Sequence, residues 1–288
     1  MKLSIIRNER KNPHPSKGMA ELMQTGPDQG VEVVVVDGSN QDVSAIAEQC
    51  GDVAMWRSGI KKNDLKKRKD LAHALREKGV FLIDEIALIN PSIEDKQYQY
   101  DLIKGHTAIA TIPSWAFINK EELEQIIQEK KLSFPLIQKP RNGARGENIF
   151  LIQNLDEITL PNNEFSSVLF QPFIKNSGDF RILSVGGIVV EMMKRIGQNG
   201  SHLNNVAQGG STELVKDIKL RELLTVLAHE VALVSKLDIF GLDILQSDVD
   251  GKLYFLEVNN LPQWQGFQQT TGIEVAKEII TFVKRVGL

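Results

Sequence analysis

Two apolar segments near the end of the chain carry polar residues that buried strands rarely hold. Residues 239–246 and 252–259 are predicted strands; Asp243 lies in the first, and Glu257 and Asn259 lie in the second. Because side chains alternate between the faces of a strand, Glu257 and Asn259 share one face. Burying a carboxylate or an amide among apolar residues is costly unless something binds it. Their oxygen atoms are of the kind that Mg²⁺ requires, so the pattern predicts a metal site.

The turn between these strands decides whether the two carboxylates meet. A two-residue turn at 250–251 would pair Asp243 with Val258, on the wrong face. A three-residue turn at 249–251, ending in a left-handed glycine, pairs Asp243 with Glu257. We expect the three-residue turn, and carboxylates on opposite faces of the sheet would refute it.

A glycine-containing loop earlier in the chain is the candidate phosphate site. The chain contains no G-x-x-x-x-G-K-[ST] run, so a P-loop is excluded. Lys139 ends the predicted strand 134–139, and the segment 141–146 follows it. Backbone N–H groups of such a turn can approach phosphate oxygens, and Lys139 can neutralise an α- or β-phosphate. Arg141 and Arg145 can add charge, although a glycine turn between strands is more often only a turn.

A second basic cluster lies on a predicted hairpin. Arg181 is on its first strand, Lys194 and Arg195 end its second, and Asn205 lies in the polar loop that follows. These side chains can bind a γ-phosphate and an acidic acceptor. Lys194 also suits a solvated strand face, whereas Arg181 stands beside buried strand residues.

The order of predicted elements indicates an α/β (α+β) fold. A β–α–β opening predicts a parallel sheet covered by helices, with strands at 2–7 and 31–37 around a helix at 16–24. We expect an N-terminal α/β unit at 1–90, a central subdomain with the phosphate loop at 91–167, and a C-terminal subdomain with the metal site at 168–288.

Composition narrows the classes of partner. The chain has 288 residues and a formal net charge of −3, which calls for neither nucleic acid nor a membrane. Its apolar runs are too short to span a bilayer. The first residues turn charged too early for a secretion signal, and the single cysteine, Cys50, excludes an internal disulfide. We therefore expect a cytoplasmic protein.

These segments, in this order, resemble the ATP-grasp superfamily, and in particular its RimK-type branch of carboxylate–amine ligases with a glutathione synthetase-like fold. No single stretch is specific, but eight in the right order and spacing are. The matching stretches are Asp95-Lys96, Ile137-Gln138-Lys139-Pro140, Leu169-Phe170-Gln171-Pro172-Phe173-Ile174, Gly178-Asp179-Phe180-Arg181, Met193-Lys194-Arg195, Asn205 with Gly209-Gly210, Gly241-Leu242-Asp243-Ile244 and Leu256-Glu257-Val258-Asn259. The chain departs from the family's usual pattern at two positions that the resemblance places near the site of the acceptor substrate. Gln208 stands where a basic residue is usual, and no glycine follows Pro262.

The resemblance implies an N-terminal parallel-sheet domain and two α+β subdomains that clamp ATP. It also implies two magnesium ions, with Mn²⁺ able to substitute. The implied metal ligands are Asp243, Glu257 and Asn259, and the implied catalytic residues are Arg181, Arg195 and Asn205. The nucleotide would be bound by Lys96 and Lys139 at its phosphates, by Gly143, Arg145 and Gly146 in the loop, by a hinge of Gln171, Pro172, Phe173 and Ile174 at the adenine, and by Asp179 and Lys194.

The implied activity is ATP-dependent formation of an amide bond through an acyl-phosphate. The partners are then a carboxylate substrate and an amine acceptor, such as an amino acid, a peptide or a protein tail, and a homo-oligomer remains open. No side-chain nucleophile is needed, which agrees with the lack of a Ser/His/Asp or Cys/His arrangement. Two alternatives remain: a small-molecule kinase on the same fold, and a nucleotide-binding scaffold or sensor without catalysis.

Overall fold

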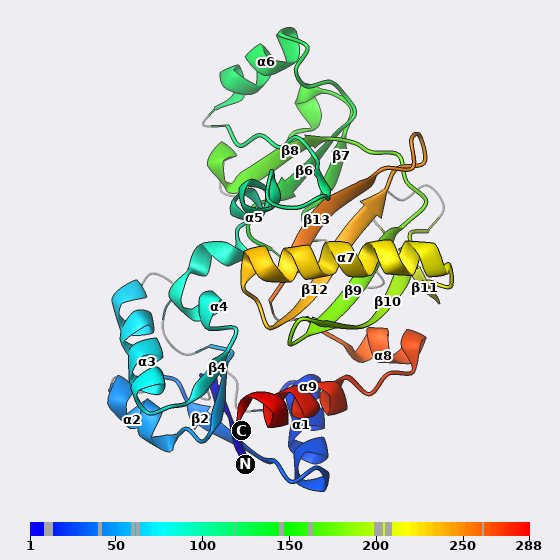
Figure 1. The fold of residues 1–288 in the computed structure, drawn as a ribbon. Coiled ribbons are helices and arrows are strands. Elements are labelled where there is room, and N and C mark those ends of the chain that lie inside the picture. Colours follow the sequence, from blue (N-terminus) through cyan, green and yellow to red (C-terminus); the bar gives the residue numbers. More distant parts are fainter. Residues whose placement is uncertain are drawn as a thin grey trace.

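Three β-sheets organise the part of the chain that the structure describes (Figure 1). This computed structural model describes residues 1–8, 14–39, 42–58, 61, 64–117, 119–143, 147–160, 164–198, 204, 209–260 and 262–288. Its strands are β1 (Lys2–Arg7), β2 (Glu32–Asp37), β3 (Val53–Trp56), β4 (Phe81–Ile83), β5 (Ala110–Thr111), β6 (Leu136–Pro140), β7 (Phe150–Ile152), β8 (Val168–Pro172), β9 (Asp179–Val185), β10 (Ile188–Ile196), β11 (Ser211–Leu214), β12 (Ile239–Gln246) and β13 (Leu253–Asn259). Its helices are α1 (Lys17–Asp28), α2 (Val43–Gln49), α3 (Leu65–Glu77), α4 (Glu85–Ile89), α5 (Lys96–Ile103), α6 (Lys120–Gln128), α7 (Ile218–Ser235), α8 (Gln265–Thr271) and α9 (Val275–Val286), with 3-10 turns η1 (Pro91–Glu94), η2 (Leu155–Glu157) and η4 (Phe165–Ser167).

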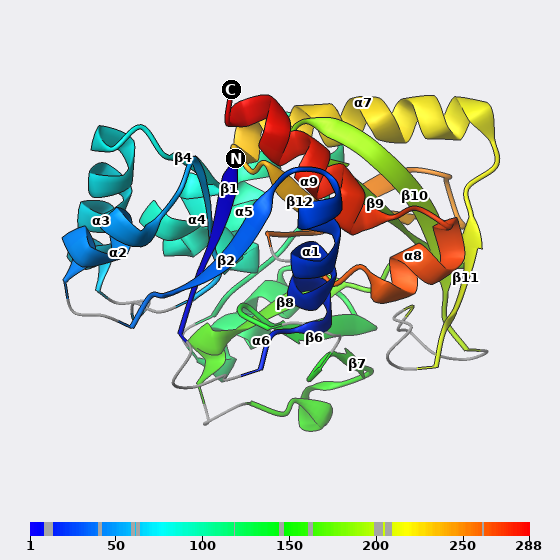
Figure 2. The same cartoon turned by 90° about the horizontal axis from the view of Figure 1, so that it is seen from below.

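The N-terminal sheet is parallel and has helices on both faces, as the β–α–β opening predicts. Its strand order is β2-β1-β3-β4. Alternate residues of β1 face opposite layers, because Leu3 and Ile5 join a core with α1 and α9, whereas Ile6 joins a core with α2 and α3. The last helix, α9, therefore returns across the molecule to cover the first sheet beside α1 (Figure 2).

The second sheet is small and antiparallel, in the order β7-β6-β8. Helix α6 packs on it through Leu123, in a core shared with Phe117 and Phe170. The predicted limit at residue 168 separates β8 from β6, the strand to which it is hydrogen-bonded. We place β8 with the central unit, while the domain limits as a whole stay a prediction.

The third sheet has the order β11-β10-β9-β12-β13-β5, and only β5 runs parallel to its neighbour. Helices α5 and α7 cover one face, where apolar side chains of β9, β12 and β13 form a continuous core. The opposite face of the same strands carries the polar residues of the predicted site. The alternation of side chains along each strand therefore separates core from site.

Two aspartates tie the N-terminal unit to the third sheet. The Asp84 N–H donates to Asp238 Oδ2 at 2.7 Å, and Asp84 Oδ1 accepts from the N–H groups of Asp238 and Ile239 at 2.6 and 3.0 Å. Burial, assisted by the Asp238 charge, raises the pKa of Asp84 to about 7 despite these N–H donors and Arg57. This contact joins the end of β4 to the start of β12.

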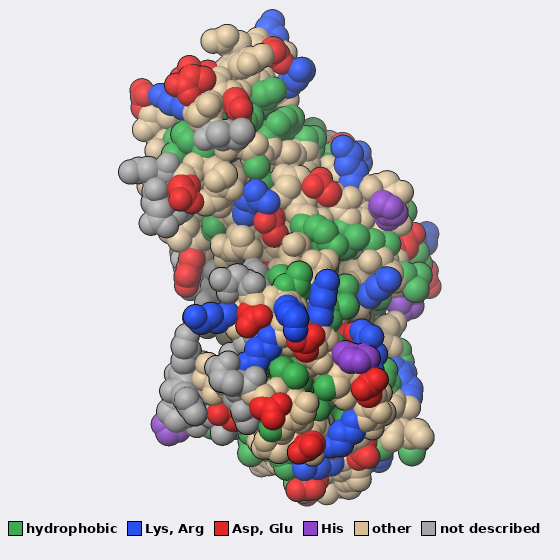
Figure 3. All heavy atoms as spheres, turned by 90° about the vertical axis from the view of Figure 1, so that its left-hand side faces the viewer, with side chains coloured by type: hydrophobic (Ala, Val, Ile, Leu, Met, Phe, Trp, Pro, Cys, Tyr) green, Lys and Arg blue, Asp and Glu red, His purple; other side chains and the backbone are tan. Residues whose placement is uncertain are grey.

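The surface is mixed in charge on the face drawn in Figure 3, where acidic and basic side chains are interspersed. Among the residues that the structure describes, no helix combines the length and the apolar character needed to cross a bilayer.

Candidate functional site

The β12–β13 hairpin brings Asp243 opposite Glu257, as predicted, but by a different turn. Near the turn Ile244 pairs with Phe255, and the Ser247 N–H donates to the Lys252 carbonyl, so the turn has four residues, 248–251. The predicted three-residue turn is therefore wrong, although its glycine, Gly251, is left-handed with φ 71°.

An extra residue in β13 restores the expected pairing. The register shifts between Asp243 and Ile244, which leaves Leu256 as a β-bulge and pairs Asp243 with Glu257. A bulge can direct two successive side chains toward one face, and both Leu256 and Glu257 line the same pocket. Without the bulge Asp243 would face Leu256, and the two carboxylates would point to opposite faces.

Helix α5 holds the bulge in place. The Tyr100 hydroxyl donates to the Leu256 carbonyl at 2.8 Å and accepts from Lys139 Nζ at 2.8 Å. The side-chain amide of the preceding residue, Gln99, accepts from the Val258 N–H and donates to the Val258 carbonyl. The irregular backbone beside Glu257 is thus hydrogen-bonded by side chains of a neighbouring helix, as buried backbone groups require.

Four charged side chains of alternating sign form a chain on the site face of the third sheet. Arg195 Nε donates to Asp179 Oδ1 at 2.6 Å, and Arg195 also reaches Asp243 Oδ2 at 2.9 Å. The other oxygen of Asp243 accepts from Arg181 at 2.6 Å. Burial alone would disfavour the Arg195 charge, but Asp243 and Asp179 outweigh it and raise the pKa of Arg195. Both guanidinium groups are therefore held in a fixed direction by carboxylates.

Gly241 makes room for this arrangement. A Cβ atom at residue 241 would lie 2.8 Å from Arg181 Cζ. The guanidinium of Arg181 thus lies across β12 at the one position that has no side chain. The glycine of the Gly241-Leu242-Asp243 stretch therefore has a packing reason.

The structure corrects the grouping of Lys194 with the two arginines. Lys194 pairs with Phe180, whose ring lies in the core under α7, while Arg195 pairs with Asp179 on the other face. Lys194 lines a second pocket, with Thr212. Neighbouring residues of one strand face opposite ways, so Lys194 does not join the cluster around Asp243.

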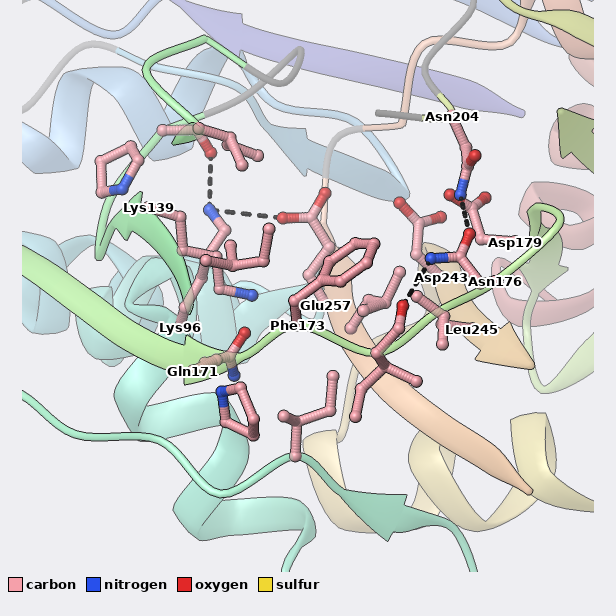
Figure 4. Close-up of a pocket in the computed structure, with 18 of the residues that line it drawn as sticks. Lys96, Lys139, Gln171, Phe173, Asn176, Asp179, Asn204, Asp243, Leu245 and Glu257 are labelled. Atoms are coloured by element: carbon pink, nitrogen blue, oxygen red, sulfur yellow. Dashed lines mark hydrogen bonds and ion pairs between the residues drawn. The ribbon is translucent and has the colours of Figure 1, made fainter. Parts of the chain in front are cut away.

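Two lysines approach the carboxylates from the opposite side (Figure 4). Lys96 Nζ donates to the Gly143 carbonyl at 3.0 Å and lies 3.3 Å from Glu257 Oε2. Burial would raise the pKa of Glu257, but Lys96, the Asn259 amide, Arg181 and Lys139 lower it to about 2.

Burial acts in the other direction on Lys139. It lowers the pKa of this lysine to about 8, and the Glu257 charge opposes the shift only in part. Among the described residues its hydrogen-bond partner is the neutral Tyr100 hydroxyl, so this buried lysine is ready to bind an anion.

Arg141, which was expected to add charge at the phosphate site, instead forms an ion pair with Asp95. Its guanidinium donates to both carboxylate oxygens of Asp95, and Asp95 caps the N-terminus of α5. The Lys96 N–H donates to the Arg141 carbonyl at 2.9 Å, so the glycine loop is attached to the start of α5. Arg141 thus fixes the loop beside the two lysines.

These groups surround one pocket with an apolar and a charged part. The apolar side chains lie between the second and third sheets and include Ile112, Ile137, Phe173, Ile174, Leu245 and Leu256. The predicted hinge, Gln171 to Ile174, lines this part together with Lys139. Figure 4 shows Glu257 between the two lysines and the Asp243–Asp179 side. Such a slot matches a flat heterocycle that carries an anionic tail.

The oxygen set at the charged end fits magnesium held jointly with phosphates. Among the described residues, no cluster of three or more His, Cys, Asp or Glu side chains could hold a metal by itself. Asp243 uses one contact per oxygen; Glu257 Oε1 accepts from Asn259 at 2.9 Å and Oε2 faces Lys96. Since a carboxylate accepts about four hydrogen bonds, acceptor capacity remains on both. Magnesium commonly takes one or two carboxylates and completes its shell with substrate phosphates.

Other predicted site residues fall outside the description. Arg145, Gly146 and Asn205 are not among the described residues, whereas Gly143 lines the pocket. Sequence reasoning missed Asn204 and Asn176. Both line the pocket, and Asn204 donates to Asn176 Oδ1 at 2.9 Å. Nothing in the local sequence marks either one, although Asn204 precedes the predicted Asn205.

The chain is similar in sequence and in fold to known proteins. A family model described as a RimK-like ATP-grasp domain matches residues 94–283. A probable alpha-L-glutamate ligase of Teredinibacter turnerae is 30% identical over 215 residues, which cover 72% of this chain and 68% of that protein. A probable alpha-L-glutamate ligase of Haemophilus influenzae is 33% identical over 159 residues, which cover 53% of this chain and 51% of that protein.

Solved structures resemble the whole chain at lower identity. The ATP-grasp ligase PsnB, complexed with a minimal precursor, Mg and ADP, has a TM-score of 0.73 at 14% identity, covering 100% of this chain and 97% of that one. D-cycloserine synthetase DcsG has a TM-score of 0.70 at 15% identity, covering 99% and 100%. The predicted fold class is confirmed.

Proposed function

The chain belongs to the RimK-like ATP-grasp family, and on that premise we propose that it is an ATP- and magnesium-dependent carboxylate–amine ligase. One observation supports this most strongly. A single pocket joins an apolar slot with Lys96 and Lys139 to a charged end lined by Asp179, Asp243, Glu257 and Arg195, and Arg181 is bound to Asp243. Phosphoryl transfer needs positioning and charge stabilisation rather than a side-chain nucleophile, and this pocket offers both.

We assign the nucleotide to the slot between the second and third sheets. Gln171 to Ile174 would contact the adenine, while Lys96, Lys139 and the loop around Gly143 would bind the phosphates. Asp243, Glu257 and Asn259 would hold magnesium, with two ions as the number implied by the family and Mn²⁺ as an expected substitute. The metal would neutralise phosphate charge as a Lewis acid.

The arginines would act on the reacting group. A substrate carboxylate oxygen attacks the γ-phosphorus, the bond to the β-phosphate oxygen breaks, and ADP leaves. Arg181 and Arg195, fixed by Asp243 and Asp179, would stabilise the negative charge of the transferred group. The amine then attacks the acyl-phosphate carbonyl carbon, inorganic phosphate leaves, and the amine proton passes to solvent.

The names of the relatives and neighbours suggest the first substrates to test. The sequence relatives are named as glutamate ligases, and PsnB is complexed with a precursor. We therefore propose L-glutamate as the first amine, with amino acids and short peptides as acids.

The test measures ADP and inorganic phosphate from the purified protein, ATP, magnesium and this substrate pool. A ligase releases both only when acid and amine are present, and Glu257→Gln abolishes the release. Phosphate found on a hydroxyl compound without free phosphate would identify a kinase instead. Tight ATP binding without turnover for any acid–amine pair would favour a scaffold or sensor.

A further inference from the structure

A hydrogen bond between the first helix and the segment after the metal-site strand joins two distant parts of the chain. Trp264 Nε1 donates to Glu21 Oε2 at 2.6 Å, across 243 residues of sequence. Trp264 is 3% exposed and directly precedes α8, whereas Glu21 lies on α1. Figure 2 shows α1 and α8 on the same side of the molecule. We name Gly18, Glu21 and Trp264 the α1 clasp.

The Glu21 carboxylate accepts hydrogen bonds from three side chains of this segment. Besides the indole, Gln265 Nε2 donates to Oε1 at 3.4 Å and Gln268 Nε2 donates to Oε2 at 3.3 Å. A hydrogen bond to an ionised group is stronger than one between neutral groups. The indole has a single donor, and its contact is the shortest of the three, so Glu21 fixes the direction of the ring.

Gly18 provides the space that the indole occupies on α1. A Cβ atom at residue 18 would lie 2.5 Å from Trp264 Cζ2, a distance at which the ring has to move. Gly18 is a buried residue of α1, and glycine is less favourable than alanine in a helix. Residues three apart share a face of a helix, so Gly18 and Glu21 together form a seat for Trp264.

The chain between Asn259 and Trp264 has no other hydrogen-bonded anchor among the described residues. Asn259 is the last residue of β13 and pairs with Gly241. Residues 260, 262 and 263 take part in no hydrogen bond with the described part of the chain, and residue 261 lies outside it. Segments with few hydrogen bonds open locally at low cost. Trp264 is thus the first hydrogen-bonded point after the metal-site strand.

The position of Asn259 matters because it is one of the three predicted metal ligands. Its amide group donates to Glu257 Oε1 at 2.9 Å, which leaves the amide oxygen for a metal ion. Magnesium demands nearly ideal octahedral geometry, so a displaced ligand weakens its site.

We propose that Glu21 and Trp264 are positioning residues, which hold the end of β13 so that the Asn259 oxygen reaches the metal. Gly18 serves the same role by leaving the seat for the indole open. The inference rests on the proposed function, because the metal site assigned there is the site that the clasp positions.

The test measures Mn²⁺ binding to the full chain in the presence of ADP, from the electron paramagnetic resonance signal of free Mn²⁺. Partners bonded directly to metal ligands contribute about 10–100-fold to metal affinity. Because the clasp acts through a short stretch of chain, we expect Glu21→Leu and Gly18→Ala each to weaken Mn²⁺ binding by about five- to tenfold. Asn259→Ala is the reference for a lost ligand. Gln24→Leu is the matched control, since Gln24 is an exposed residue of α1.

Further readouts separate positioning from a loss of folding. ADP affinity without metal should be unchanged in both clasp variants, and excess Mg²⁺ should restore their rate of ADP release. Glu21→Gln keeps an acceptor for the indole, so it should bind Mn²⁺ within about twofold of wild type. Gly18→Ala raises helix propensity, so a weaker Mn²⁺ site in that variant does not come from a destabilised α1.

Unchanged Mn²⁺ affinity in either folded clasp variant would overturn the proposal, as would an equal loss in Gln24→Leu or in Glu21→Gln. A wild-type chain that binds no Mn²⁺ with ADP, or unchanged affinity in Asn259→Ala, would overturn it together with the metal assignment. Clasp-dependent Mn²⁺ binding without turnover for any acid–amine pair refutes the ligase alone. A working ligase whose Mn²⁺ affinity is the same in both clasp variants refutes the clasp alone.

Discussion

Replacing Tyr100 by phenylalanine tests whether helix α5 holds the bulge that aligns the carboxylates. The change removes one hydroxyl but keeps the ring, which packs edge-on against Phe255 at 5.5 Å, so no cavity forms. Two groups lose their partner: the Leu256 carbonyl and the Lys139 ammonium, each 2.8 Å from the hydroxyl. A buried polar group left without a partner costs about 1–3 kcal/mol. Two such groups would together cost about 2–6 kcal/mol. Because Lys139 can turn toward the pocket and find other partners, we expect the lower part of that range, a loss of about 2–4 kcal/mol in the free energy of unfolding.

The assay is urea unfolding, with and without ADP and magnesium, together with nucleotide affinity. We also expect weaker nucleotide binding, because Lys139 and Glu257 both lose alignment. Tyr98→Phe is the matched control on the same helix; its hydroxyl accepts only from the Asn90 amide among the hydrogen bonds of described residues. The reasoning is wrong if Tyr100→Phe is as stable as Tyr98→Phe and binds nucleotide normally.

Three further changes probe the site and the domain contact. Gly241→Ala should push Arg181 off Asp243 and lower the rate of ADP release by about tenfold or more, with about 1–3 kcal/mol lost in stability, because the buried Asp243 carboxylate loses one of its two arginine partners; an unchanged rate would refute the packing role. The pKa of Lys139 is about 8, so nucleotide affinity measured by calorimetry should fall as pH rises from 7 to 9, and Lys139→Arg should flatten that dependence. The pKa of Asp84 is raised to about 7, so the folded chain keeps a proton that the unfolded chain releases above about pH 4, and stability falls as pH rises through this window. Asp84→Asn should then be more stable than wild type at pH 8, by up to about 4 kcal/mol, with the gap closing toward pH 4; a pH-independent gap in thermal unfolding would contradict this.

Much of the site could be predicted because its key residues lie on β-strands, where the alternation of side chains shows which of them share a face. Asp243, Glu257 and Asn259 stand out as polar residues in apolar strands, and alternation alone puts the last two on one face. The same rule, applied to residues 193–195, would have separated Lys194 from Arg195. That error came from treating neighbouring basic residues as one cluster.

Other features left no local signal. The bulge at Leu256 replaces no turn residue and adds no glycine, and the partner that stabilises it, Tyr100, is 156 residues away. The central strand β3 was not predicted, since four residues give too short a pattern. The return of α9 to the first sheet is likewise a tertiary contact, which an amphipathic pattern allows but does not specify.

The alternating charges explain how Asp243 is tolerated in the middle of an apolar strand. An isolated buried carboxylate would be far too costly, but here each oxygen accepts from an arginine, and Arg195 is in turn held by Asp179. The four side chains sum to no net charge, so this cluster does not by itself repel an anionic ligand. Their geometry nevertheless fixes two guanidinium groups, and fixed donors cost no reorganisation when negative charge develops on a transferred phosphoryl group. Stability of the empty site and stabilisation of the transition state therefore depend on the same contacts, and a variant that removes Asp179 should weaken both.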